Sequence, residues 1–176
     1  MEQPVLDAIR SRRVARRMSD APIAPAQLEA VLASVRWAPS AGNRRLQRFV
    51  AVQDPTTIHL VRMVAPGMLQ RPAALVLICI DSQRVEHFRL PRQNMGVYID
   101  VGCALQTLLL SAHAVGLAAG PVTSFSKAAV RALLNFPAGL SPEVIVCLGH
   151  AAPDDLPTMR RRKLSWRDLV HWERFE

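Results

Sequence analysis

The sequence lacks the short motifs that mark the most common catalytic centres. It has no G-x-x-x-x-G-K-[ST] phosphate loop, no G-x-G-x-x-G fingerprint, no H-E-x-x-H zinc motif and no G-x-S-x-G nucleophile elbow. Its five histidines are scattered along the chain. A site built on metal or acid–base chemistry therefore has no support in the sequence.

Paired cysteines are also missing. The three cysteines, Cys79, Cys103 and Cys147, form no C-x-x-C pair, and each lies in an apolar segment. This excludes a zinc ribbon or a dithiol redox motif and favours buried free thiols in a reducing compartment. The first ten residues, MEQPVLDAIR, contain no apolar signal region. We therefore expect a cytoplasmic protein.

Aromatic residues make up only 5% of the chain, whereas the formal net charge is +8 and the isoelectric point is near 10.9. A strongly basic chain is typical of nucleic-acid-binding modules, but no aromatics interleave the basic runs, which disfavours single-strand binding. Arginine predominates, and its guanidinium group binds phosphate or carboxylate through paired hydrogen bonds. The basic clusters lie at residues 10–17, 44–48 and 160–163. They indicate either converging anion-binding groups or three solvated faces.

One long apolar run, from Met95 to Gly120, dominates the remaining pattern. Its apolar residues fall on nearly every face of a helix, which indicates burial in a core or against another subunit. Asp100 and His113 interrupt the run and argue against a membrane span. Both are expected to be structural. Gly116 should end the helix, and the rest of the chain should wrap around it.

The rest of the chain alternates between helix and strand patterns. Helices are predicted from Pro4 to Ile9, from Ala26 to Trp37, after a cap at Asp54, and from Ser126 to Asn135. Strands are predicted at residues 48–53, 73–80 and 143–149, with a polar connection at 81–94. A chain of 176 residues is expected to form one domain, spanning residues 1–176. The pattern predicts an α+β fold with helices on both faces of a central sheet.

Four segments carry groups suited to binding a phosphate. They are RSRRVAR at residues 10–16, APSAGN at 38–43, GPVTSF at 120–125 and the arginine run at 160–162. Taken alone, each has an ordinary explanation as a basic face, a loop, a turn or a solvated charge run. Only their order and spacing make them specific.

That arrangement resembles the FMN-dependent nitroreductase family. The matching segments are IRSRRVAR, WAPSAGNRRLQRFVAV, DVGCALQTLLLSAHAVGLAAGPVTSF, VIVCLGH and RRRKLSWRDLVHWERF, which together cover nearly the whole chain. The resemblance implies a nitroreductase-like α+β homodimer. Its central mixed or antiparallel sheet would be flanked by helices, with the long helix at the dimer interface. Each dimer would hold two tightly but non-covalently bound FMN molecules.

The resemblance also implies the residues that would bind the cofactor. Arg12, Arg13 and Arg16 would hold the phosphate and the polar edge of the ring, and Val14 in the same segment would also contact the cofactor. The partner subunit would supply Pro39, Ser40, Asn43 and Arg45. Pro121, Val122 and Thr123 would lie along the isoalloxazine, and Arg160 and Arg162 would approach the phosphate. The C-terminal segment WRDLVHWERF would wrap around the partner.

In such a protein the flavin accepts a hydride from NAD(P)H and passes electrons to a nitroaromatic, a quinone or a related small acceptor, while side chains bind and orient. No catalytic side chain is expected. The alternatives are a flavin- or deazaflavin-dependent dehydrogenase or oxidase of a biosynthetic pathway, and a basic nucleic-acid-binding module.

Two features depart from the family pattern. Arg45 stands where the family commonly has a glutamine that touches the flavin, which favours an anionic substrate or flavin form. The segment from Asp54 to Asn94 is short for the family, so we expect a more open pocket.

Overall fold

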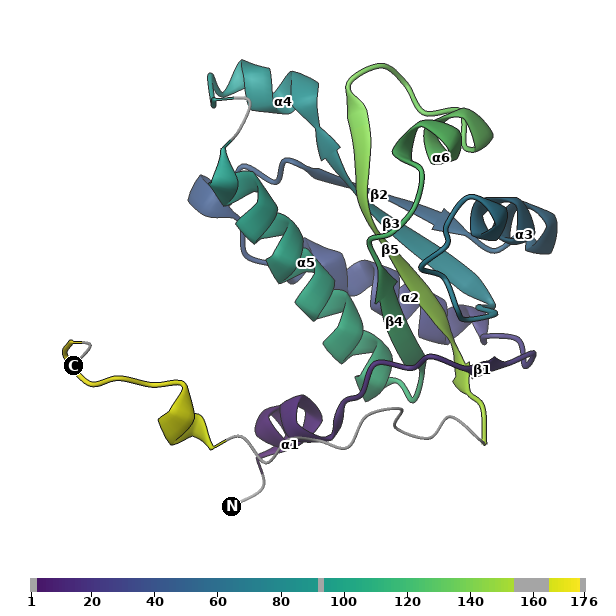
Figure 1. Ribbon diagram of the computed structural model, residues 1–176, viewed down its shortest axis with the longest axis horizontal. Helices are drawn as coiled ribbons and strands as arrows, with labels where there is room; N and C mark the ends of the chain where they lie inside the picture. Colours follow the sequence, from purple (N-terminus) through teal and green to yellow (C-terminus); the bar gives the residue numbers. More distant parts are fainter. Residues whose placement is uncertain (1–2, 92–93, 154–164, 175–176) are drawn as a thin grey trace.

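The computed structural model of the protein describes residues 3–91, 94–153 and 165–174 (Figure 1). The α-helices are α1 (Pro4–Ser11), α2 (Pro25–Ser34), α3 (Pro55–Met63), α4 (Ser82–His87), α5 (Met95–Ala114) and α6 (Lys127–Leu133). The strands are β1 (Met18–Ser19), β2 (Gln47–Val52), β3 (Ala74–Asp81), β4 (Ala118–Val122) and β5 (Leu140–Ala151). Short 3₁₀ helices are η1 (Val35–Trp37), η2 (Ala41–Asn43) and η3 (Trp166–Asp168).

The strands form a five-stranded sheet in the order β1-β5-β3-β2, and β4 also pairs with β5. All of these strand pairs are antiparallel, and a parallel contact occurs at the isolated bridge between Val14 and Ala119. The predicted strands correspond to β2, β3 and β5. The sequence misses β1, which has two residues, and β4, which contains the strand-poor residues glycine and proline.

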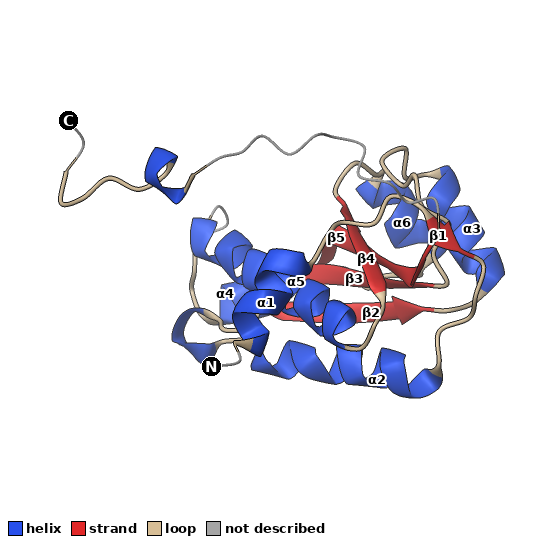
Figure 2. Ribbon diagram, turned by 90° about the horizontal axis from the view of Figure 1, so that it is seen from below, coloured by secondary structure: helices blue, strands red, loops and turns tan. Residues whose placement is uncertain are grey.

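Helices cover both faces of the sheet, as predicted (Figure 2). Alternate residues of β3 divide between the two layers because successive side chains of a strand point to opposite faces. Ala74, Val76 and Ile78 pack in one cluster with residues of α2 and α5, whereas Leu75 and Leu77 pack in the other with residues of α3 and α6. The strand is therefore apolar throughout and lies at the centre of the protein.

The long helix α5 packs against α2, β3, β4 and β5. Its opposite face is open, and Met95, Tyr98 and Ile99 are 76%, 54% and 61% exposed. The protomer therefore buries one side of α5, and burial of the other side against a second subunit stays a prediction. Among the described residues, α5 is the helix long and apolar enough to cross a membrane by length and composition, but it packs as a core helix of the sheet.

Several local predictions are confirmed by specific hydrogen bonds. Asp54 caps α3 by accepting from the Thr57 N–H, and Ser126 caps α6 in the same way. Gly116, with φ of +77°, follows the end of α5. Two predictions at the ends of the long run were wrong in detail. Residues 82–87 of the expected polar connection form α4. The Gly-Pro pair expected to form a turn lies instead in strand β4, which begins two residues after Gly116.

Candidate functional site

The arginine segment leaves α1 as an extended chain that lies beside β4. Arg12 is the C-cap of α1, and its φ and ψ of −53° and 136° end the helix. Val14 then forms the bridge to Ala119, and the Ala15 N–H donates to the Ala119 carbonyl at 3.0 Å. Two of the predicted segments, far apart in sequence, are thus joined by backbone contacts.

The guanidinium groups of Arg12 and Arg13 have different environments. Nη1 of Arg13 lies 2.7 to 2.8 Å from the carbonyl oxygens of Arg10, Ser11 and Arg12, so it caps the C-terminus of α1. Nε and Nη1 of Arg12 are buried, and no described residue accepts a hydrogen bond from them. The residue as a whole is half-buried. Two buried nitrogen atoms without an acceptor are unfavourable, and an anion bound by the Arg12 side chain would supply one.

Gln70, which is not among the predicted site residues, joins the arginine segment to β4. This side chain is only 4% exposed, and its Nε2 donates to the Ala15 carbonyl at 2.9 Å. A Cβ at Gly120 would lie 2.5 Å from the same Nε2 and 2.6 Å from the Ala15 oxygen. The glycine thus permits a close approach of three chain segments. No local sequence pattern around Gln70 predicts this contact.

The segment predicted as a Gly-Pro turn is part of β4. Val122 is 3% exposed and packs in the core, so only its backbone can meet a ligand. The backbone of Ala119 bonds to Ala15 and therefore points away from β5, and by antiparallel alternation the backbone of Pro121 does the same. Proline is tolerated at such an edge because no ladder hydrogen bond is lost. Pro121 and the exposed Thr123 thus lie along an open strand edge.

The loop from Ala38 to Arg45 is held by its own hydrogen bonds. Gly42, Asn43 and Arg45 have φ values of +59°, +53° and +51°. The Ser40 hydroxyl accepts from the Arg45 N–H, and Nε of Arg45 donates to Oδ1 of Asn43 at 3.0 Å. Pro39, Asn43 and Arg45 remain exposed. Ser40, Asn43 and Arg45 are therefore brought together as one preformed polar surface.

Helix α4 is attached to this loop, although the sequence predicts only a polar connection there. Nη2 of Arg84 donates to the Arg44 carbonyl at 3.1 Å, and the Arg44 guanidinium lies 5.6 Å from the centre of the Phe88 ring. Two contacts therefore link the loop to α4 and the residue that follows it.

The loop and the arginine segment lie at opposite ends of α5 (Figure 1). Near the start of α5, the 4% exposed Asp100 accepts from the Ala41 N–H at 2.9 Å. Near its end, Nε2 of His113 lies 2.9 Å from the Ser11 hydroxyl. At a rise of about 1.5 Å per residue, these contacts are roughly 20 Å apart along the axis. The structural roles expected for Asp100 and His113 are confirmed, and one protomer does not bring the two halves of the predicted site together.

Arg160 and Arg162 lie outside the described residues. The described C-terminal segment carries Trp166 and Trp172, which meet edge to face at 6.5 Å and are 51% and 71% exposed. It lies apart from the sheet in Figures 1 and 2.

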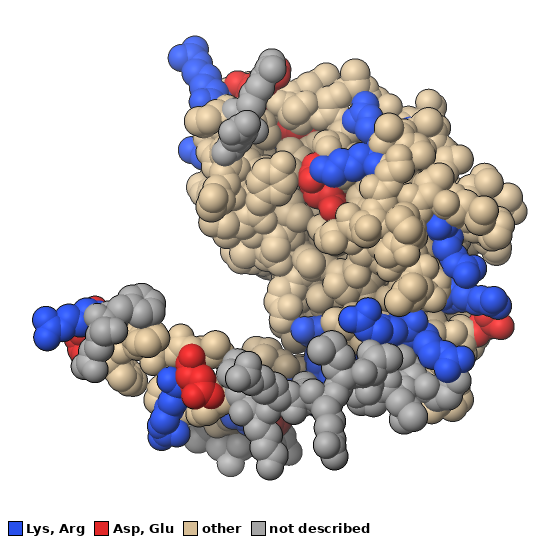
Figure 3. Space-filling view, viewed as in Figure 1, with Lys and Arg blue, Asp and Glu red and all other residues tan. Residues whose placement is uncertain are grey.

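Basic side chains gather near the arginine segment. Figure 3 shows them along the lower edge of that view, where the chain between α1 and β1 runs. Arg13, Arg16 and Arg17 are exposed there. The half-buried Arg12 and the edge of β4 at Pro121 and Thr123 thus adjoin a positively charged surface, which attracts anions.

Comparison with known proteins gives a consistent family assignment. The sequence model of the nitroreductase family matches residues 9–73 and 61–150. An NADH dehydrogenase of Thermus thermophilus is 28% identical over 93% of this chain and 98% of its own length. A 5,6-dimethylbenzimidazole synthase of Rhodobacter capsulatus is 27% identical over 96% of this chain and 94% of its own.

A solved structure agrees with both. The crystal structure of a nitroreductase from Desulfovibrio desulfuricans in complex with FMN matches with a TM-score of 0.81, at 26% identity over 100% of both chains. Both the sequence match and the shared fold extend across the arginine segment, the loop and β4. The chain belongs to the nitroreductase family.

Proposed function

We propose that this protein is an FMN-dependent oxidoreductase that takes electrons from NAD(P)H and passes them to a nitroaromatic, a quinone or a related small acceptor. The observation that carries the proposal is Arg12, whose Nε and Nη1 are buried without an acceptor among the described residues, in the segment that Val14 joins to β4. The FMN phosphate, or the polar edge of its ring, would supply that acceptor. The FMN-bound relative and the NADH dehydrogenase support the choice of cofactor and electron donor.

The residues of this chain would bind and orient the cofactor. Arg12 and Arg16 would neutralise anionic groups, Val14 would contact the cofactor from the segment between them, and Pro121 and Thr123 would border the ring along the edge of β4. Arg13 would contribute its remaining nitrogen atoms, since Nη1 already caps α1. When bound, FMN supplies hydride and electron transfer, so a nucleophile or general base in the protein is not required.

We propose that the active form is a homodimer with α5 at its interface. The exposed face of α5 presents Met95, Tyr98 and Ile99, and an apolar surface of this kind is unusual on a monomer. A two-fold axis across α5 would make the helices antiparallel. The loop around Ser40 and Asn43 in one subunit would then approach the Arg12 segment of the other, which one protomer cannot do. Arg45, exposed beside this loop, would face the shared site and favour an anionic group there.

The dimer has a direct test. Ile99→Glu places a charge on the open face of α5 and should give a monomer in light scattering after gel filtration, together with loss of FMN. Met63→Glu is the control, because Met63 is equally apolar and 72% exposed but lies on α3. A dimeric, FMN-loaded Ile99→Glu variant would show that α5 is not the interface.

The cofactor itself is tested by the absorption spectrum of the purified protein, followed by denaturation and identification of the released chromophore. We expect bands of oxidised flavin and about one FMN per chain. A colourless protein that also fails to bind added FMN would contradict the proposed function.

A second candidate keeps the flavin and changes the reaction. The synthase from Rhodobacter capsulatus, 27% identical over nearly the full chain, favours a flavin-dependent enzyme of a biosynthetic pathway. Anaerobic mixing with NADH and NADPH separates the two. Bleaching of the flavin absorbance, followed by recovery with a quinone or a nitroaromatic, supports the first candidate. A flavin that neither nucleotide reduces supports the second. For both we propose a single cytoplasmic domain spanning residues 1–176.

A further inference from the structure

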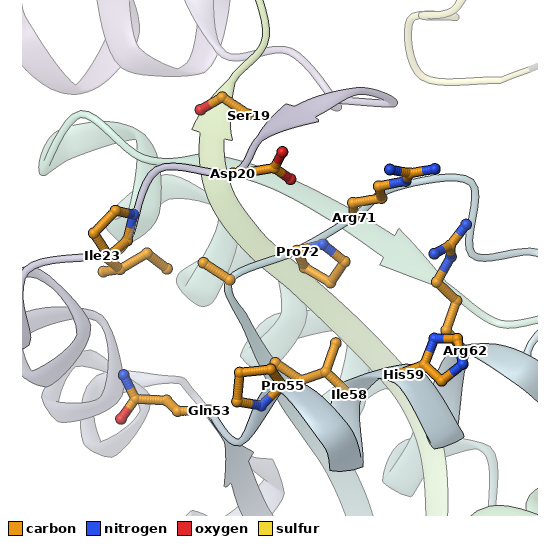
Figure 4. Close-up of a pocket in the computed structure, with 12 residues that line it drawn as sticks. Ser19, Asp20, Ile23, Gln53, Pro55, Ile58, His59, Arg62, Arg71 and Pro72 are labelled. Atoms are coloured by element: carbon orange, nitrogen blue, oxygen red, sulfur yellow. The ribbon is translucent and has the colours of Figure 1, made fainter.

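A cavity of about 470 Å³ lies between β1, α3 and the start of β3 (Figure 4). Its lining includes Asp20 after β1, Ile58 and Arg62 on α3, and Arg71 and Pro72 before β3. None of its lining residues belongs to the candidate flavin site. A volume of this size suits a small organic ligand.

The cavity has a cationic side. Arg62 and Arg71 both line this side, from α3 and from the chain before β3, and His59 precedes Arg62 on α3 (Figure 4). No described residue forms an ion pair or a side-chain hydrogen bond with either arginine. Arg62 is half-buried, which reduces the screening of its charge by water. The two guanidinium groups are therefore placed to bind one anionic head group between them.

The floor of the cavity is apolar. Ile23 and Ile58 are each 7% exposed, and Pro72 is buried, so these side chains form a fixed floor. In Figure 4 the floor extends from the arginine side toward Ile23. An apolar body bound over this floor would remove hydrocarbon surface from water on both partners.

We propose that this cavity binds an organic carboxylate with an apolar body, its carboxylate held by Arg62 and Arg71. The charge in the cavity favours a monoanion, because the carboxylate of Asp20 offsets one of the two arginines in the lining. A phosphate dianion would meet less complementary charge. The site does not depend on FMN, and the apoprotein should bind the same ligand.

The probe is para-(trifluoromethyl)phenylacetate, followed by fluorine NMR on the FMN-free protein. Its neutral amide has nearly the same shape and no charge. We expect saturable binding of the acid and a Kd for the amide that is at least about tenfold higher. A hydrogen bond to a charged group contributes about a factor of ten in affinity. Arg62→Gln and Arg71→Gln should each weaken binding of the acid by about tenfold.

Two control variants identify the site that is responsible. Arg89→Gln removes an exposed arginine elsewhere on the surface and should leave the affinity unchanged. Arg12→Gln alters only the candidate flavin site and should do the same. Equal binding of acid and amide, or binding of the acid that survives Arg62→Gln and Arg71→Gln together, would overturn the proposal. Sensitivity to Arg12→Gln alone would place the probe in the flavin site and also refute it.

Discussion

Replacing Gly120 by alanine is expected to separate the arginine segment from β4. The new Cβ would lie 2.6 Å from the Ala15 carbonyl oxygen and 2.5 Å from Nε2 of Gln70. Gln70 could move its amide away, but the Ala15 oxygen belongs to the backbone and can move only with its segment. Gly120 cannot yield, because β4 is paired along its length with β5. The arginine segment must therefore move.

The size of the effect follows from the hydrogen bonds at risk. Moving the segment weakens the bond from Ala15 N to the Ala119 oxygen at 3.0 Å and the bond from Gln70 to the Ala15 oxygen at 2.9 Å. A net contribution of about 0.5–1.5 kcal/mol for each bond gives a loss of about 1–3 kcal/mol in the free energy of unfolding. Because Arg12 lies in the same segment, FMN affinity should fall as well.

Urea denaturation of the apoprotein and fluorescence titration with FMN measure the two effects. Gly149→Ala is the matched control, because the three atoms nearest to a Cβ there all belong to the side chain of Met18, and the nearest is the flexible Sδ at 3.1 Å. We expect a smaller loss of stability in that variant and nearly unchanged FMN affinity. If Gly120→Ala matched the wild type in both assays, the close packing of Ala15, Gln70 and Gly120 would not position the arginine segment.

Three further outcomes are expected. Arg12→Gln should reduce FMN affinity by about tenfold or more in a fluorescence titration, yet leave the apoprotein at least as stable to urea, because a charged group with two buried, unpartnered nitrogen atoms is replaced by a neutral amide. Hydrogen bonds from the Thr57 hydroxyl and then its N–H hold the pKa of Asp54 below its ordinary value of 3.8. Since ionised Asp54 caps α3, its stabilisation is present above pH 3.8 and is lost as the pH falls through the lowered pKa. The stability difference between wild type and Asp54→Ala in urea should therefore shrink in acid; a constant difference would contradict a charged cap. Burial raises the pKa of Cys79 and of Cys147 to about 12, so a disulfide reagent at pH 8 should modify neither thiol until urea is added, and rapid native labelling of both would contradict their burial.

The sequence was most informative where a single local pattern decides the structure. The continuous apolar run of β3, the caps at Asp54 and Ser126, and the end of α5 before Gly116 were all predictable from residue type and spacing. The α+β class and the family followed from these elements and from the order of the motifs. Their physical basis is local backbone preference and hydrophobic periodicity, which act over a few residues.

Contacts between distant segments decided the rest. From the sequence, residues 120–125 are predicted to form a turn, because glycine and proline are poor strand residues. Pairing with β5 places the first three of them in strand β4. Gln70 has no signature because its role depends on Ala15, which is 55 residues away. The sequence does not predict which face of α5 is open, because its apolar residues lie on every side of the helix. Such a pattern does not distinguish the face that packs within the protomer from the face that remains exposed. The sequence therefore determined the elements and the family, whereas the tertiary structure determined which of the predicted site residues can meet.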